Sequence, residues 1–395
     1  MEQAPTSQRL PGNVHAFGAT SFLNDTATEM AYWVLPAFLV TIGAGPAQLG
    51  IIEGIAESAA SLAKLLSGYL ADRIPRRKPI VVLGYFTANV VKPLLAFVGS
   101  WGQVLSIRFV DRIAKGLRGT ARDVMVADSV DEKELGSAYG LIQTMDSAGA
   151  IAGPLTAVLL LSHYGFRGVF LAAAVPGFLC VLVAVLWIRE SPKSAVNRHA
   201  AESLSNPTST RLPGSFYFVL FAVTLFALGN SSDMFLVLRS QDVGISPAQA
   251  PLLGLVFNIT YTLSSWPAGR LSDRFSRYAI AAAGYMIFAA VYFVFGTAPS
   301  TLAIWMAMAC YGLFYALTNP VLKALIVEAV PADLRGRALG VYFFSTSIAT
   351  LLASIITGEL WKYSGPRMPF YLSASVAIVS SILLVVSQGA PSRRR

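Results

Sequence analysis

Charged residues are scarce in this chain of 395 residues: Asp, Glu, Lys and Arg make up only 13%, whereas hydrophobic residues make up 55%. About a quarter of the residues in an ordinary globular domain are charged. The hydrophobic residues form long blocks rather than alternating stripes, and a block of about 20 apolar residues can cross a bilayer as a helix. The composition therefore excludes an ordinary water-soluble domain and predicts a chain that lies mostly in the lipid bilayer.

Cysteine and histidine are also scarce, with two and three copies. Cys180 and Cys310 both fall inside apolar blocks, which excludes a disulfide framework. The histidines have no spacing typical of metal ligands, so we expect no metal and no cofactor. The sequence contains neither a nucleophile elbow nor a phosphate-binding glycine loop, so nothing in it indicates an enzyme.

Basic residues exceed acidic ones, 30 to 21, which gives a formal net charge of +9. They gather in short turns between apolar blocks, so we interpret the excess as topological and expect no nucleic-acid partner. The turns on one predicted side hold Arg73, Arg76, Arg77, Lys78, Arg189, Lys193, Arg198, Arg211, Arg274, Arg277, Arg335, Arg337 and the three terminal arginines. The opposite turns hold few. The positive-inside rule therefore predicts that both termini lie in the cytoplasm.

The apolar blocks predict twelve membrane-spanning helices and no strands. The spans lie near residues 17–42, 48–72, 78–98, 102–126, 137–161, 166–188, 215–239, 248–271, 278–297, 301–327, 337–361 and 368–388. The first block follows a polar start and is long enough for a full span, so we do not expect a cleaved signal peptide. Residues 189–214 are rich in Ser, Pro and charge, which predicts a cytoplasmic linker between residues 1–188 and 215–395.

The two predicted halves repeat each other. Pro46-Ala-Gln recurs as Pro247-Ala-Gln, and the same offset of 201 residues takes Asp72 to Asp273. An offset of 200 residues takes Asp128 to Glu328. A register held over several spans indicates two six-helix repeats with a site between them, an architecture common among secondary transporters.

Three motifs resemble those of a known family. Residues 68–78, Gly-Tyr-Leu-Ala-Asp-Arg-Ile-Pro-Arg-Arg-Lys, closely resemble the signature loop of the major facilitator superfamily, and residues 269–277 repeat it. Residues 112–116 resemble the family's fourth-helix motif, and residues 149–154 the fifth-helix motif of its proton-driven exporters. The resemblance implies an all-α fold of two pseudo-symmetric six-helix bundles, a monomer in the cytoplasmic membrane that moves a small organic solute by alternating access.

The fifth-helix motif is partial, because Thr156 and Ala157 stand where the exporter pattern continues with glycines. Proton-coupled efflux is therefore one interpretation, and proton-coupled uptake of a nutrient or an organic anion is the alternative. Gly149 and Gly153 lie one turn apart, which predicts close packing of the fifth span, against the eighth.

Charged residues inside apolar spans are costly and usually face a cavity or a partner. The candidates for proton coupling are Asp25, Glu29, Glu57, Arg112 and Asp146. Burial disfavours a charged carboxylate and a nearby arginine favours it, so an acid beside Arg112 can load and release a proton. Asp25 and Glu29 share one helix face and are expected to include the carrier. The alternative is a permanent ion pair that only joins the first and fourth spans; the coupling ion could also be another cation.

A second set of polar residues is expected to line the substrate cavity. Its members are Glu53, Lys115, Asn230, Asp233 and Asn258. Lys115 would favour an anionic substrate unless nearby acids neutralise it. Glu53 and Glu57 have an alternative structural role, as partners of Lys64 and Lys92.

The signature loops predict a latch that closes the cytoplasmic side. Its candidates are Asp72, Arg76, Asp128, Asp273, Arg277 and Glu328. We expect Asp72 to sit at the amino-terminal end of the eleventh span, where the helix dipole favours an anion, and Arg76 to pair with Asp128. In the second half Asp273 would sit at the start of the fifth span and Arg277 would pair with Glu328. The alternative is that these charges only set topology.

Overall fold

A computed structural model describes residues 10–73, 76–130, 135–190, 212–330 and 334–388, and this part of the chain is helical with no strand. The first half contains α1 (Gly12–Tyr32), α2 (Leu35–Thr41), α3 (Pro46–Arg73), α4 (Lys78–Val91), the 3-10 helix η1 (Lys92–Phe97), α5 (Trp101–Ala127), α6 (Leu135–Ala172) and α7 (Ala174–Leu186). The second half contains α9 (Gly214–Gly229), α10 (Met234–Asp242), α11 (Ala250–Arg274), α12 (Arg277–Thr297), α13 (Thr301–Glu328), α14 (Arg335–Ser364) and α15 (Met368–Gln388). Most of the predicted linker lies outside the described residues, so its boundaries stay a prediction.

Every predicted span has a helical counterpart, but four of them are divided between two helices. The first span divides into α1 and α2, the third into α4 and η1, the sixth into the end of α6 and α7, and the seventh into α9 and α10. The fifth and sixth spans are joined as α6 at a sharp turn where Gly165 has a φ of 62°. Seven stretches of the described chain are long and apolar enough to cross a membrane by length and composition alone. Charged side chains interrupt α5, and polar residues such as Asn258 lower the hydrophobicity of α11.

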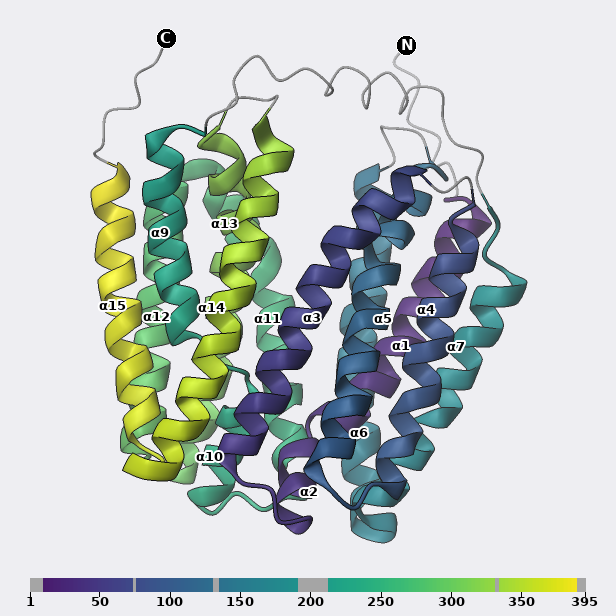
Figure 1. The fold of residues 1–395 in the computed structure, drawn as a ribbon, viewed down its shortest axis with the longest axis horizontal. Coiled ribbons are helices and arrows are strands. Elements are labelled where there is room, and N and C mark those ends of the chain that lie inside the picture. Colours follow the sequence, from purple (N-terminus) through teal and green to yellow (C-terminus); the bar gives the residue numbers. More distant parts are fainter. Residues whose placement is uncertain (1–9, 74–75, 131–134, 191–211, 331–333, 389–395) are drawn as a thin grey trace, which may run out of the picture.

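The helices form two bundles that converge at one end (Figure 1). Helices α1 to α7 make the first bundle, and α9 to α15 make the second. We call the end where α1 begins and α15 ends the terminal end, and the opposite end, where α2 and α10 lie, the distal end. The ribbons meet at the distal end and stand apart at the terminal end.

Glycines allow the bundles to meet closely through α3 and α14. A Cβ on Gly50 would lie 2.2 Å from the carbonyl oxygen of Ser354, and a Cβ on Gly358 would lie 2.6 Å from that of Pro46. No side chain fits in such a gap, so the distal contact is backbone against backbone. Farther along the same helices, Ser58 Oγ donates a hydrogen bond to Ser347 O at 2.9 Å.

Gly149 and Gly153 of the fifth-helix motif pack against α1. The expected contact of the fifth span with the eighth, α11, is also present, but it is made through other residues, such as Asn258, whose Nδ2 donates to Ala150 O at 3.2 Å. A Cβ on Gly149 would lie 2.5 Å from Phe22 O, and a Cβ on Gly153 would lie 2.8 Å from Thr26 O. Each glycine also faces an acid of α1, since the same Cβ atoms would lie 3.1 Å from Asp25 Cβ and 2.7 Å from Glu29 Cβ, respectively. The motif therefore makes room for the two acids.

The cores of the two bundles differ in chemistry. The second bundle is filled by stacked aromatic rings, such as Phe226 on Tyr285 with centroids 3.7 Å apart. The first bundle buries charge: Arg108 and Glu53 are paired at 2.7 Å, and both side chains are almost fully buried. As the sequence predicts, ionisable groups concentrate in the first bundle.

Candidate functional site

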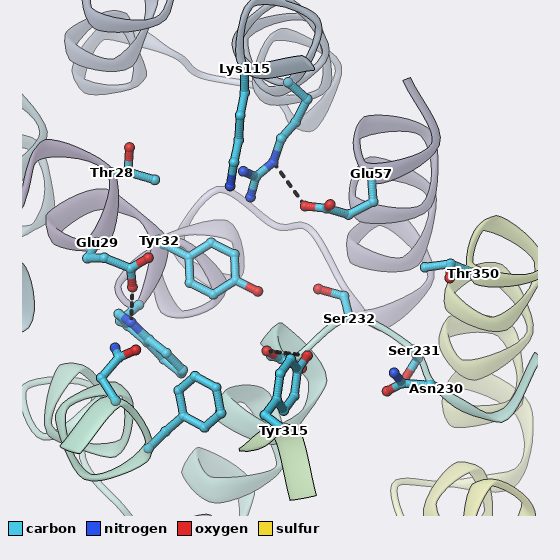
Figure 2. Close-up of a pocket in the computed structure, with 15 residues that line it drawn as sticks. Thr28, Glu29, Tyr32, Glu57, Lys115, Asn230, Ser231, Ser232, Tyr315 and Thr350 are labelled. Carbon is cyan, nitrogen blue, oxygen red and sulfur yellow. Dashed lines mark hydrogen bonds and ion pairs between the residues drawn. The ribbon is translucent and has the colours of Figure 1, made fainter. Parts of the chain in front are cut away.

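A central cavity of about 380 Å³ lies between the two bundles. Its first wall comes from α1, α3 and α5, and its second wall comes from the break between α9 and α10 together with α11, α13 and α14. Figure 2 shows Glu29, Glu57 and Lys115 from the first wall around the same space as Asn230 and Tyr315 from the second. A cavity of this size is at the small end of ligand sites, which are roughly 300–1,000 Å³.

The break between α9 and α10 supplies part of the second wall. Residues 230–233, Asn-Ser-Ser-Asp, lie between the two helices, and Asn230 has φ −102° and ψ 86°. Non-helical backbone at membrane depth is tolerated where it lines a cavity, because its polar groups need partners there. Both Asn230 and Asp233 line the cavity, as expected. Within the described chain, Asn230 Oδ1 is buried without a hydrogen-bond partner.

Asp233 is held by hydroxyl groups. Tyr311 donates to its Oδ1 at 2.7 Å, and the Tyr315 hydroxyl lies 3.3 Å from both of its oxygens. Asn258 also lines the cavity, and its Nδ2 donates to Ala150 O of α6 at 3.2 Å. Asn258 therefore joins the bundles as well as lining the space between them.

Glu29 lines the first wall and accepts a hydrogen bond from Trp33 Nε1 at 2.6 Å. No ion pair involves Glu29 among the described residues. Arg112, its predicted partner, binds Glu57 Oε1 at 3.0 Å instead. The expected pairing of the α1 acids with Arg112 is therefore wrong: the ion pair joins α5 to α3, because these two helices pack side by side through Gly116, whose Cβ would lie 2.4 Å from Ala60 O.

A second cavity, of about 320 Å³, leads from the first toward the terminal end. It lies between α1, α3, α5 and α6 and shares Glu57 and Lys115 with the central cavity. Its wall also carries the predicted acids Asp25 and Asp146. The two cavities thus share part of their walls, and Glu29 of the first and Asp25 of the second lie one helical turn apart on α1.

Arg122 is the basic partner of acids in the second cavity, a role that the sequence did not assign to it. Its Nη1 lies 3.9 Å from Asp146 Oδ1, and its Nε lies 3.1 Å from Asp123 Oδ1. The same guanidinium donates to Ser21 Oγ of α1 at 3.1 Å. The only signal in the sequence was the spacing of four residues between Arg118 and Arg122, which gives the helix face and not the partner.

Glu53 is placed differently from the expectation. It is fully buried and does not line the central cavity. Nε and Nη2 of Arg108 donate hydrogen bonds to its carboxylate at 2.7–2.9 Å. Its expected alternative partners, Lys64 and Lys92, are not bound to it; Lys92 lies 3.5 Å from Asp111 instead. Ser232 of the second bundle donates to Glu53 Oε2 at 3.1 Å. Glu53 is therefore part of a contact between the bundles.

A family model for the Major Facilitator Superfamily matches residues 17–238 and again residues 219–395. The chain belongs to the Major Facilitator Superfamily. It is 33% identical over 387 residues to an uncharacterized MFS-type transporter of Methanocaldococcus jannaschii, a match that covers 96% of this chain and 95% of that protein. It is 22% identical over 382 residues to the multidrug resistance efflux pump PmrA of Streptococcus pneumoniae, covering 93% and 94%.

Solved structures of this superfamily share the fold. The crystal structure of the nucleoside transporter NupG matches with a TM-score of 0.77 at 14% identity, covering 95% of this chain and 99% of that one. These findings confirm the predicted major facilitator fold, which has twelve spans. This superfamily member is a membrane transporter rather than an enzyme.

The signature loop of this transporter is described only in part. Asp128 binds Arg77, whereas Arg76 is exposed, so the expected pair of Arg76 with Asp128 is wrong by one residue. Arg277 begins α12 at the terminal end. The side chains of Asp72, Asp273 and Glu328 lie outside the described residues, and their roles in a latch stay predictions.

Proposed function

We propose that this transporter is a proton-coupled exporter of small organic solutes that works as a monomer in the cytoplasmic membrane. Both termini are in the cytoplasm in this proposal, because basic residues such as Arg76, Arg77 and Arg277 gather at the terminal end. The distal end then faces outward. With the bundles packed at the distal end and the cavities leading to the terminal end, the structure corresponds to an inward-facing state.

The observation that carries the proposal is the placement of Glu29. Its carboxyl lines the central cavity, binds Trp33 and has no basic partner among the described residues, whereas Arg112 is occupied by Glu57. A carboxyl at membrane depth that is not fixed in an ion pair is free to exchange a proton with the cavity. Asp25 and Asp146, on the path toward the cytoplasm, are placed to pass that proton on.

Two observations support export. The efflux pump PmrA is a relative over nearly the whole chain. The glycines of the exporter-like motif, Gly149 and Gly153, pack directly behind Asp25 and Glu29, so the motif contacts the proposed proton path. Uptake stays the alternative, because the motif is interrupted at Thr156.

The test uses everted membrane vesicles in which respiration acidifies the lumen and a fluorescent amine reports the pH gradient. Addition of a transported compound, from a panel of zwitterionic, cationic and anionic organic solutes, should dissipate the gradient through the wild-type protein. Glu29→Gln should abolish this response, because the amide cannot exchange a proton. Glu359→Gln, which removes an acid from α14 outside the cavity lining, is the control and should respond as wild type.

A Glu29→Gln protein that still dissipates the gradient would exclude Glu29 as the carrier. Direction is decided by the same compounds in vesicles of opposite orientation. If they accumulate only when the outer medium is acidic in right-side-out vesicles, the protein is an importer and the export proposal is wrong.

A further inference from the structure

Three ionisable groups of the central cavity have no partner of opposite charge among the described residues. Arg112 and Glu57 neutralise each other at 3.0 Å, which leaves Lys115, Glu29 and Asp233. Glu29 is assigned to the coupling proton, as proposed above, and is not counted among the groups that balance the charge of the substrate. One positive group and one negative group then remain for the substrate to match.

Lys115 supplies the positive group on the first wall. Figure 2 shows its side chain extending from α5 into the cavity, where it is exposed. The next residue, Gly116, packs against α3, so α5 is fixed on that side and presents Lys115 to the open space. A lysine with a purely structural role at membrane depth would be paired with an acid. An unpaired ammonium facing a cavity is instead suited to a carboxylate or a similar anion of a ligand.

Asp233 supplies the negative group on the second wall. Both tyrosines that bind it, Tyr311 and Tyr315, donate hydroxyl hydrogens, and hydroxyl donors orient a carboxylate without neutralising its charge. Nothing basic from the second bundle lines the cavity in the described chain. The ammonium group of a ligand would supply the positive charge that Asp233 lacks.

Aromatic rings line the space near these groups. The ring centroids of Trp33 in the first bundle and Phe257 in the second are 6.3 Å apart, and those of Phe257 and Tyr315 are 5.1 Å apart. Tyr32 adds another ring to the first wall. Such faces suit an aromatic or apolar body and also attract an ammonium group.

We propose that the cavity binds a small zwitterion, a carboxylate and an ammonium joined by an aromatic or apolar body, with the carboxylate at Lys115 and the ammonium at Asp233. This substrate class rests on the proposed transport function, in which Glu29 is reserved for the coupling proton. A cation lacking the carboxylate would meet Lys115 unpaired, and an anion lacking the ammonium would meet Asp233 unpaired. Each loses one charged hydrogen bond, which corresponds to roughly tenfold weaker binding.

The test measures binding to the purified full-length protein by isothermal titration calorimetry at fixed pH, without a proton gradient. The probes are L-phenylalanine and L-tryptophan, each with its amide, which is a cation, and its N-acetyl derivative, which is an anion. The zwitterions should bind about tenfold more tightly than either derivative. Lys115→Gln should remove the preference over the amides, and Asp233→Asn the preference over the N-acetyl compounds. Lys362→Gln, an exposed lysine at the distal end of α14, is the matched control and should change neither.

The proposal is overturned if no probe binds the wild-type protein, if an amide or N-acetyl derivative binds as tightly as its zwitterion, or if Lys115→Gln keeps the full preference. Lys115 is exposed, so its variant carries the test even if Asp233→Asn fails to fold. Because the calorimetric test applies no gradient, a negative binding result leaves proton coupling to be judged from Glu29→Gln in vesicles. A negative result in the vesicles, in turn, leaves the binding result intact.

Discussion

Two acids of α1 have room because α6 carries no side chain where each of them packs. Gly149 and Gly153 bring the backbone of α6 against α1 directly behind Asp25 and Glu29. Close approach of this kind is the usual reason for small residues at membrane helix contacts. Here it also places the rigid backbone of one helix behind the groups proposed to carry the proton, so packing and coupling share the same residues.

Gly153→Ala tests this link. The added methyl would lie 2.7 Å from Glu29 Cβ and 2.8 Å from Thr26 O, and α1 would have to shift. Overpacking of this kind costs about 1–3 kcal/mol, so we expect a lower melting temperature in detergent and a weaker substrate-induced loss of the pH gradient.

The matched control is Gly140→Ala in the same helix, where a Cβ would have nothing within 4 Å. It should be neutral or should stabilise α6 by up to about 1 kcal/mol, since alanine is the better helix former. Equal effects of the two substitutions on stability and on coupling would contradict the role given to Gly153.

Individual pairings were harder to predict than the residues that form them. Polar groups inside apolar spans are costly and usually face a cavity or a partner. The sequence could therefore identify Glu29, Lys115, Asn230 and Asp233, all four of which line the cavity. The partners of these residues could not be predicted, because a spacing of four residues identifies the face of one helix but not the helix that packs against that face. Arg108 was missed for the same reason, although it shares a helix face with Arg112.

At the scale of helices, the sequence predicted the spans and the repeat but not the breaks within spans. Hydrophobicity over a window of about 20 residues is insensitive to a few unwound residues, so residues 215–239 read as one helix. The run Asn-Ser-Ser-Asp at residues 230–233 was the available signal, because these side chains compete with the backbone for hydrogen bonds. That break carries Ser232 and Asp233, which contact the other bundle and the cavity, respectively.

The break also contributes to the closed distal end, and Ser232→Ala tests how much. Ser232 donates to buried Glu53 across the bundles, so its loss should weaken closure by about 1 kcal/mol, roughly a fivefold increase in the distal-open population. The measurement is a spin-label distance between Val40 and Tyr363, exposed residues at the distal ends of opposite bundles, in a Cys310→Ser background.

Ser240→Ala is the control for this experiment. Its hydroxyl donates to Val237 O within α10 and not across the bundles. It should leave the distance distribution of the wild-type protein unchanged. A distribution that is also unchanged in Ser232→Ala would show that backbone packing at Gly50 and Gly358 closes the distal end without help from Glu53.

On the scale of the whole molecule, the two bundles divide the chemistry between them. The first bundle holds the buried ion pairs and the proposed proton path, and the second holds an aromatic core with Asp233 at its edge. A rigid aromatic bundle that moves against a charged one would carry Ser232 away from Glu53 as the distal end opens. Charged residues of the first bundle that are exposed at the terminal end could then form contacts that close that end.

Rocking of rigid bundles requires the two ends to move in opposite directions, and Asp72→Asn tests this. If Asp72 latches the terminal end in the outward-facing state, its loss should favour the state described here and reduce transport while leaving membrane insertion intact. Spin labels at Leu186 and Phe275, exposed residues near the terminal ends of opposite bundles, should then give fewer short distances, and labels at Val40 and Tyr363 fewer long ones. Normal transport with unchanged distances would mean that Asp72 only sets topology, and distances that lengthen at both ends together would rule out rocking about the central cavity.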